Sequence, residues 1–181
     1  MPSLRLHSVS LAILALALLP ASGTAADTPD SGKTIVRDGM SIQLPKGWAS
    51  EESPAGRTVL IAHSPDKEKD DTGEFPTTLT IALHPAKPDG KAIQEANARE
   101  LKDYKPLEPP RDLQINGAAG VALGGTFTQG VLKLRTRQYV LSSGDKGFVI
   151  TLVMLESRWD KYHQLAEAAI ATFHIGDAAK K

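Results

Sequence analysis

Three basic side chains recur at alternate positions late in the chain, in a segment with the pattern of a β-strand. Lys133, Arg135, Arg137 and Tyr139 share one face of the strand that we expect over 131–141. Such a row is either a solvated face with salt bridges or a docking surface for an acidic partner or an anionic ligand. We take these four residues as the candidate partner-binding site, and the sequence singles out no catalytic residue.

Metal and nucleophile chemistry have weaker signals. His63 and His84 stand near the ends of two consecutive expected strands, and antiparallel pairing would put them at opposite ends of the sheet. The sequence has no His-x-x-x-His pair, no Gly-x-Ser-x-Gly elbow and no cysteine. We therefore predict no metal site and no cofactor, and a metal ion held by His63 or His84 is the alternative.

An acidic run between two prolines covers 64–76. Its acids at 66, 68 and 70 have the alternate spacing of a calcium loop, but Asp71 stands where such a loop needs a glycine. Thr77 likewise stands where the loop needs a bidentate glutamate. The low apolar content predicts a mobile surface loop rather than a metal site.

Several glycines between 117 and 125 raise the question of a phosphate-binding loop. Their spacing does not match the dinucleotide fingerprint, and no Gly-Lys-Ser/Thr ending follows. Small residues in a strand more often allow another element to approach closely. We therefore interpret these glycines as packing positions.

The elements that position these residues begin with a diagnostic stretch, 39–48. Met40, Ile42 and Leu44 alternate with polar residues, which predicts a strand with one face on a core. A proline and a glycine then turn the chain, and Trp48 is expected to fold back into the core.

The remaining elements follow from periodicity and turn residues. A helix is expected from 90 or 91 to 104, and a better amphipathic helix, capped by Ser157, carries apolar residues at helical spacing from 159 to 173. The near-continuous apolar run 148–155 predicts the central strand. The other expected strands cover 35–36, 58–63, 77–84, 113–115 and 118–127.

The domain organisation follows from composition. Residues 1–26 have a basic start, an apolar core and a small-residue end, which predicts a signal peptide cut near Ala25 or Ala26. We expect a flexible leader over 27–33, a single domain over 34–175 and a polar tail over 176–181. With 21 basic and 21 acidic residues, the charge balance does not favour a nucleic-acid binder, and no second apolar segment predicts a membrane span.

Taken in order, these features resemble the PsbP-like fold, which photosystem accessory proteins share with DcrB-like periplasmic proteins and a nuclear-transport factor that binds the GTPase Ran. The stretches 39–48, 115–120, 137–152 and 158–173 carry the resemblance. It implies an α/β (α+β) fold, an α/β/α sandwich with a largely antiparallel central sheet and helices on both faces. It also implies binding rather than catalysis, and no residue set ties this chain to a manganese cluster.

Together, the signal peptide and the resemblance predict an exported periplasmic or secreted accessory protein without catalytic activity. Its expected partner is a protein of the cell envelope. Related type VI secretion chaperones lack an export signal, so that role is not favoured. The alternative is a small-molecule or metal-binding periplasmic protein, and a hydrolase is less favoured because no clustered polar groups are evident.

Overall fold

The computed structural model describes residues 32–51, 56–84 and 89–176. The expected signal peptide (1–26), nearly all of the leader and residues 177–181 of the tail lie outside these ranges. None of the described helices is long and apolar enough to cross a membrane. The elements are β1 (Thr34–Arg37), β2 (Met40–Gln43), β3 (Ala49–Glu51), β4 (Thr58–Asp70), β5 (Gly73–His84), α1 (Gly90–Glu100), β6 (Lys105–Ile115), β7 (Ala118–Gln129), β8 (Leu132–Ser143), β9 (Lys146–Leu155), η1 (Glu156–Arg158), α2 (Trp159–Ala171) and β10 (His174–Ile175).

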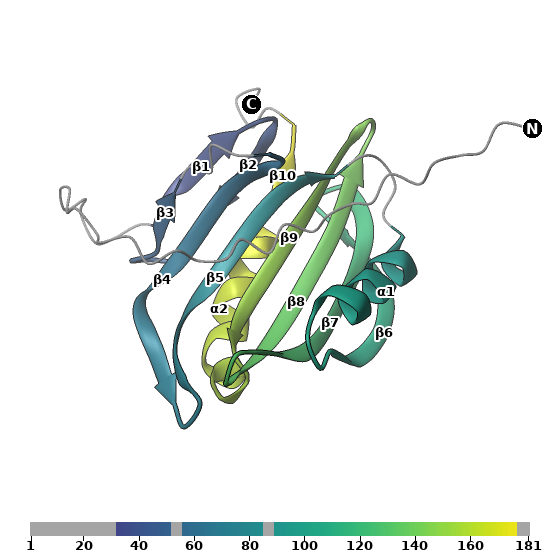
Figure 1. Cartoon of the computed structure of the whole chain (residues 1–181). Helices are drawn as coiled ribbons and strands as arrows, with labels where there is room; N and C mark the ends of the chain where they lie inside the picture. The colour runs from purple at the N-terminus through teal and green to yellow at the C-terminus, as the bar shows by residue number, and fades with distance from the viewer. Residues whose placement is uncertain (1–31, 52–55, 85–88, 177–181) are drawn as a thin grey trace, which may run out of the picture.

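A seven-stranded antiparallel sheet forms the centre of the domain, in the order β3-β4-β5-β9-β8-β7-β6 (Figure 1). The strand β9 is the middle one, as its apolar run predicts. A second, three-stranded sheet has the order β1-β2-β10, and its strands also pair antiparallel. The expectation of a largely antiparallel sheet is therefore confirmed.

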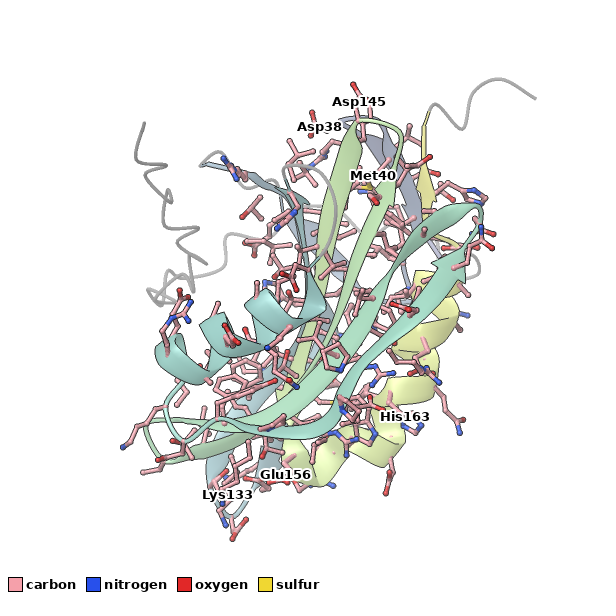
Figure 2. The ribbon with its side chains drawn as sticks, turned by 90° about the vertical axis from the view of Figure 1, so that its right-hand side faces the viewer. Asp38, Met40, Lys133, Asp145, Glu156 and His163 are labelled. Atoms are coloured by element: carbon pink, nitrogen blue, oxygen red, sulfur yellow. The ribbon has the colours of Figure 1, made fainter. Side chains whose placement is uncertain are left out.

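The two helices contact opposite faces of the large sheet (Figure 2). Adjacent residues of a strand point to opposite faces. Gln138 of β8 bonds Asn97 of α1, and Tyr139 beside it bonds Glu167 of α2. Each face, however, carries one helix, α1 contacts mainly β6 and β7, and the small sheet packs into the core on the α2 face. The domain is thus richer in strand than the expected α/β/α sandwich.

The main core lies on the α2 face and includes the stretch that opens the domain. Met40, Ile42 and Leu44 are buried, and Trp48 is only 6% exposed. Phe148 of β9 meets Phe173, just after α2, edge to face at 5.6 Å between ring centres. The prediction that Trp48 folds back into the core is correct.

The acidic run 64–76 is not a loop, contrary to the sequence-based expectation. It belongs to β4 and β5, which stay paired from Lys67 opposite Pro76 to Asp70 opposite Gly73. Only Asp71 and Thr72 turn the chain. The run is poor in apolar residues, and its carboxylates Glu68 and Asp70 find partners on η1 and α2.

Two helix boundaries also differ from expectation. The helix α1 ends at Glu100, and β6 starts at Lys105 rather than near position 113. Prolines within β6 are tolerated because it is an edge strand, with one side free of ladder bonds. Ser157 does not cap α2, since its hydroxyl donates to Asp70, and Arg158 occupies the N-cap position without a side-chain bond.

The glycines of β7 are packing positions, as predicted. A Cβ on Gly120 would lie 2.2 Å from the Val140 carbonyl oxygen, and one on Gly125 would lie 2.4 Å from the Tyr104 ring. Neither glycine has an unusual backbone conformation, so close approach is the reason for the small residue. Large side chains of neighbouring elements can therefore pack directly over the backbone of β7.

Candidate functional site

The predicted basic row lies on the α2 face of the sheet. Arg135, Arg137 and Tyr139 stand beside Thr126, Gly124 and Ala122 of β7. On the far side of β7, Glu108 and Arg111 of β6 stand beside the same Gly124 and Ala122. The strands β6 and β8 thus present charged side chains to one another across a strand of small residues. We call Glu108, Arg111, Arg135, Arg137 and Tyr139 the arginine face.

Arg137 is neutralised within this face. Its guanidinium forms an ion pair with Glu108, and its side chain is only 11% exposed. Gly124 makes the pairing possible, because an added Cβ there would lie 3.6 Å from Arg137 Cδ and 3.0 Å from the Thr136 carbonyl oxygen. The guanidinium also lies 5.6 Å from the centre of the Tyr139 ring. This arginine is therefore a structural cross-link between β8 and β6.

Tyr139 links the sheet to α2. It is almost fully buried, and its hydroxyl donates to Glu167 Oε1 at 3.2 Å. Burial is the main cause that raises the pKa of Tyr139 above its usual value, and the nearby Arg137 opposes the shift. The phenol therefore stays protonated and acts as a donor.

Arg135 differs from Arg137 in its surroundings. Its guanidinium carbon lies 3.7 Å from the centre of the Trp159 ring, and its Nε is buried without a hydrogen bond. No ion pair or hydrogen bond to Arg135 exists among the described residues. Burial lowers the pKa of this arginine, and the charges of Asp160 and Glu156 oppose the shift. An arginine stays charged under such a shift, so Arg135 is a partly desolvated cation.

Trp159 has a second neighbour in the first turns of α2. The His163 ring stacks on it at 5.3 Å between centres and 11° between planes. The distance from His163 Nδ1 to the Trp159 carbonyl oxygen is 2.9 Å, so the ring N–H donates to that oxygen. Both contacts fix the indole, which in turn provides a rigid support for Arg135.

Lys133, the fourth predicted residue, does not join the others. It is exposed at the start of β8, and its backbone N–H donates to Thr72 Oγ1 at 3.4 Å. Figure 2 shows it at the same end of the molecule as Glu156. The structure therefore brings together three of the four predicted residues and leaves Lys133 at the edge.

A small cavity of about 180 Å³ adjoins the arginine face between β6 and the second half of α2. Its lining residues are Arg111, Ile115, Tyr139, Glu167, Ile170 and Ala171. The cavity thus combines apolar side chains from both elements with one basic and one acidic side chain. Sequence reasoning missed Glu108, Arg111 and Glu167, because strand β6 was expected to begin after the first two of them and nothing paired α2 with β8.

The histidines considered for a metal site lie apart. His63 Nδ1 is 3.1 Å from Thr78 Oγ1, and in β5 Thr78 stands six residues from His84. At about 3.3 Å per residue, that spacing separates the two histidines by roughly 20 Å. The described ranges contain no group of three or more His, Cys, Asp or Glu side chains that could hold a metal ion.

A second polar cluster ties the β4–β5 hairpin to the start of α2. Glu68 is nearly buried and accepts hydrogen bonds from Tyr162 and from Lys161 Nζ, the latter at 2.8 Å. The bond from Lys161, followed by that from Tyr162, lowers the pKa of Glu68. Ser157 donates to Asp70 at 2.6 Å, and chiefly for that reason the pKa of Asp70 falls to about 2. Because these carboxylates are satisfied internally, we interpret the cluster as structural.

Comparison with known proteins places this geometry in a fold. No family model matches the sequence, and no curated protein matches it. Cyanobacterial PsbP (CyanoP) from Synechocystis sp. PCC 6803 is similar in structure, with a TM-score of 0.57, 13% identity and coverage of 87% of this chain and 98% of that one. LpqN of Mycobacterium tuberculosis, which is involved in cell envelope biogenesis, has a TM-score of 0.54, 16% identity and coverage of 82% and 90%.

A protein of unknown function from Pseudomonas aeruginosa, PA94, is similar to the same extent. Its TM-score is 0.53 at 17% identity, and the match covers 78% of this chain and 95% of that one. All three matches span most of both chains, so the likeness extends over the whole domain rather than one motif. At these identities it concerns the fold alone, and the chain has the PsbP-like fold that its sequence predicts.

Proposed function

We propose that this protein is an exported, non-catalytic accessory protein that binds a partner protein of the cell envelope through its arginine face. Support for the location comes from the sequence of residues 1–26 and from the structural likeness to LpqN, a protein involved in cell envelope biogenesis. Support for the surface comes from the side chains of β8 and β6.

The observation that carries the proposal is that Arg135 forms no ion pair with any residue that the structure describes, although Asp160 and Glu156 act on its charge from a distance. On the same face, Arg137 has a structural role and is paired with Glu108. The absence of such a pair at Arg135 within the described ranges therefore suggests a role other than stability. Stacking on Trp159 contributes about 0.5–2 kcal/mol to holding the cation. Because Arg135 Nε is buried, an anionic group supplied by a partner would bond the terminal N–H groups of this guanidinium, to which no described residue bonds.

The other polar groups of the face support binding rather than catalysis. Glu108 is held by Arg137, and Glu167 accepts from the Tyr139 hydroxyl. A general base needs a lone pair within hydrogen-bond reach of the group that it activates. Both glutamates are instead engaged in contacts that join secondary-structure elements, which suits a rigid recognition surface.

The proposal is tested by affinity capture from the envelope of the organism that encodes the protein. The full chain with a C-terminal tag is compared with Arg135→Glu and with the milder Arg135→Gln. The control is Arg99→Glu, which changes an exposed arginine of α1 on the opposite face by the same charge.

We expect the amount of at least one captured protein to fall about tenfold or more with Arg135→Glu. The new carboxylate would repel the acidic group of the partner. Capture should persist with Arg99→Glu. Unchanged thermal melting of each variant shows that folding is intact. Equal capture by all variants would contradict the proposal.

A further inference from the structure

The small cavity next to the arginine face has the size of a side chain rather than of a cofactor. Pockets for drug-sized ligands measure about 300–1,000 Å³, whereas this cavity measures about 180 Å³. Ile115, Ile170 and Ala171 give it apolar lining, and Arg111 and Glu167 line it as well. An aliphatic or aromatic side chain entering here would bury apolar surface and leave its own backbone beside charged groups that can bond it.

Arg135 offers a second, separate contact. A guanidinium that stacks on an aromatic ring keeps the N–H donors of its own plane free, and this fork matches the two oxygens of a carboxylate. Trp159, fixed by its stacking on His163, holds the guanidinium at 3.7 Å. The geometry of Arg135 therefore suits one carboxylate rather than a polyanionic surface.

The charges around Arg135 argue against a polyanionic surface as the ligand. Glu108 stands beside Arg137, between Arg135 and the cavity in the strand register, Glu167 lines the cavity, and Asp160 and Glu156 act on Arg135 itself. Like charges brought together at an interface cost free energy. A phospholipid headgroup layer or an acidic polysaccharide would meet these four carboxylates, whereas a single side-chain carboxylate can avoid them.

The spacing of the two contacts is that of an extended peptide. Tyr139, which lines the cavity, and Arg135 are four residues apart on β8, which corresponds to about 13 Å at 3.3 Å per residue. An extended peptide covers the same distance in four residues, and its positions i and i+4 point to the same side. Between the contacts, Glu108 is 39% exposed and can accept from peptide N–H groups, while Arg137 is only 11% exposed and holds Glu108 in place.

We propose that the arginine face and the adjacent cavity bind an extended peptide segment of a partner protein. The segment places an aliphatic or aromatic side chain in the cavity and an Asp or Glu, four residues away, on Arg135. This inference rests on the proposed function and specifies its ligand.

The test begins with selection of a random-peptide phage library on the full-length protein. Enriched peptides should carry an acidic residue four positions from an aliphatic or aromatic one. Fluorescence anisotropy then compares one enriched peptide with versions that have Gln for the acid, Ala for the apolar residue, or one residue deleted between them. Each change should weaken binding about tenfold or more, the size of a lost charge-assisted hydrogen bond or a lost apolar anchor.

Protein variants assign the two ends of the peptide. With Arg135→Gln the acid-containing and Gln-containing peptides should bind equally, whereas with Arg99→Gln their difference should persist. Ala171→Leu changes an exposed residue of the cavity wall. It should weaken binding of the peptide that carries the apolar residue and leave binding of the Ala version unchanged. The inference would be overturned if no peptide is enriched. It would also be overturned if the enriched peptides bind equally well to the wild type, to Arg135→Gln and to Ala171→Leu.

The two proposals fail separately. Should envelope capture depend on Arg135 while no peptide is selected, the peptide inference is wrong and the proposed function stands. Binding of phosphatidylglycerol vesicles that is lost with Arg135→Gln, without any peptide binding, would likewise overturn the inference in favour of a lipid surface. If capture is independent of Arg135, the proposed function itself is wrong.

Discussion

At the scale of residues, two arginines on one strand face have opposite environments. Arg137 crosses Gly124 to reach Glu108, whereas Arg135, two positions earlier, rests on Trp159 and forms no ion pair within the described ranges. A row of alternating basic residues in the sequence cannot distinguish these cases. The distinction depends on what lies across β7 and on what α2 places over the strand, and both are tertiary facts.

The ion pair of Arg137 yields a prediction for stability. Glu108→Gln leaves a guanidinium whose side chain is only 11% exposed without its anion, and should lower the free energy of unfolding by about 1–3 kcal/mol. The control is Glu74→Gln, which removes an exposed pair with Lys69 at 3.6 Å and should change it by less than about 0.5 kcal/mol. Urea denaturation measures both, and equal losses would show that burial does not govern the pair.

At the scale of elements, side chains far apart in sequence hold the helix α2 at both ends. At its C-terminal end, the Asn116 amide donates to the carbonyl oxygens of Ala171 and Phe173 at 2.8 and 2.9 Å. At its N-terminal end, the β4–β5 hairpin binds it through Glu68 and binds the preceding turn η1 through Asp70. Because α2 carries Trp159 and Glu167, these contacts also position the arginine face.

The contact at the C-terminal end can be tested by one substitution. Asn116→Asp should destabilise the fold by about 1–2 kcal/mol, because a carboxylate cannot donate and meets carbonyls at the negative end of a helix. Asn116→Gly should cost less than this, since Asn116 has a φ of 48° that glycine adopts without strain. Chemical denaturation ranks the two variants, and the reverse order would contradict this account of the turn.

The hairpin contact predicts a dependence on pH. The folded state lowers the pKa of Asp70 from 3.8 to about 2, so its contribution to stability is present above pH 3.8 and is lost as the pH falls toward 2. Glu68 also stabilises the fold less as the pH falls, since its pKa in the folded state lies below its ordinary value of 4.5.

We therefore expect the urea midpoint of the wild type to fall as the pH falls from 4 to 2, and Asp70→Asn to flatten part of that fall. Asp71→Asn, which changes an exposed carboxylate without a hydrogen bond among the described residues, is the control. If Asp70→Asn and wild type have parallel profiles, the hairpin contact does not contribute to acid sensitivity.

The elements also show what the sequence could and could not predict. The strand β9 and the buried face of α2 are regular apolar patterns, and both are where periodicity places them. The hairpin arm over 64–76 and the start of β6 were missed because most of their residues are polar or proline and show no apolar alternation. Their strand structure depends on partners in α2 and on an edge position, which one-dimensional periodicity does not contain.

At the scale of the whole molecule, fold and site were predictable to different degrees. The turn residues near Gly39 and Asn116 and the packing positions of Trp48 and Gly120 mark the PsbP-like fold, because backbone geometry constrains them directly. The site was only half visible. Arg135, Arg137 and Tyr139 followed from alternation, but their partners come from β6 and α2, and the cavity arises where these elements meet.

The proposed location is a further prediction for the whole chain. Expressed in a Gram-negative host, the full chain should appear in the periplasmic fraction, shortened to an N-terminus near Asp27, because residues 1–26 have the pattern of a signal peptide. A version that lacks residues 2–26 should stay in the cytoplasm. Fractionation and intact-mass measurement check both, and an uncleaved cytoplasmic full chain would contradict export.

The central claim, that the arginine face is the partner surface, is tested most directly by photo-cross-linking in living cells. A photoreactive amino acid replaces Arg111, which is exposed beside the cavity, or Arg99 on the opposite face as the control. We predict a cross-linked species from position 111 that disappears when Arg135→Glu is added, and no such species from position 99. Cross-links that form equally at both positions, or that persist with Arg135→Glu, would contradict the claim.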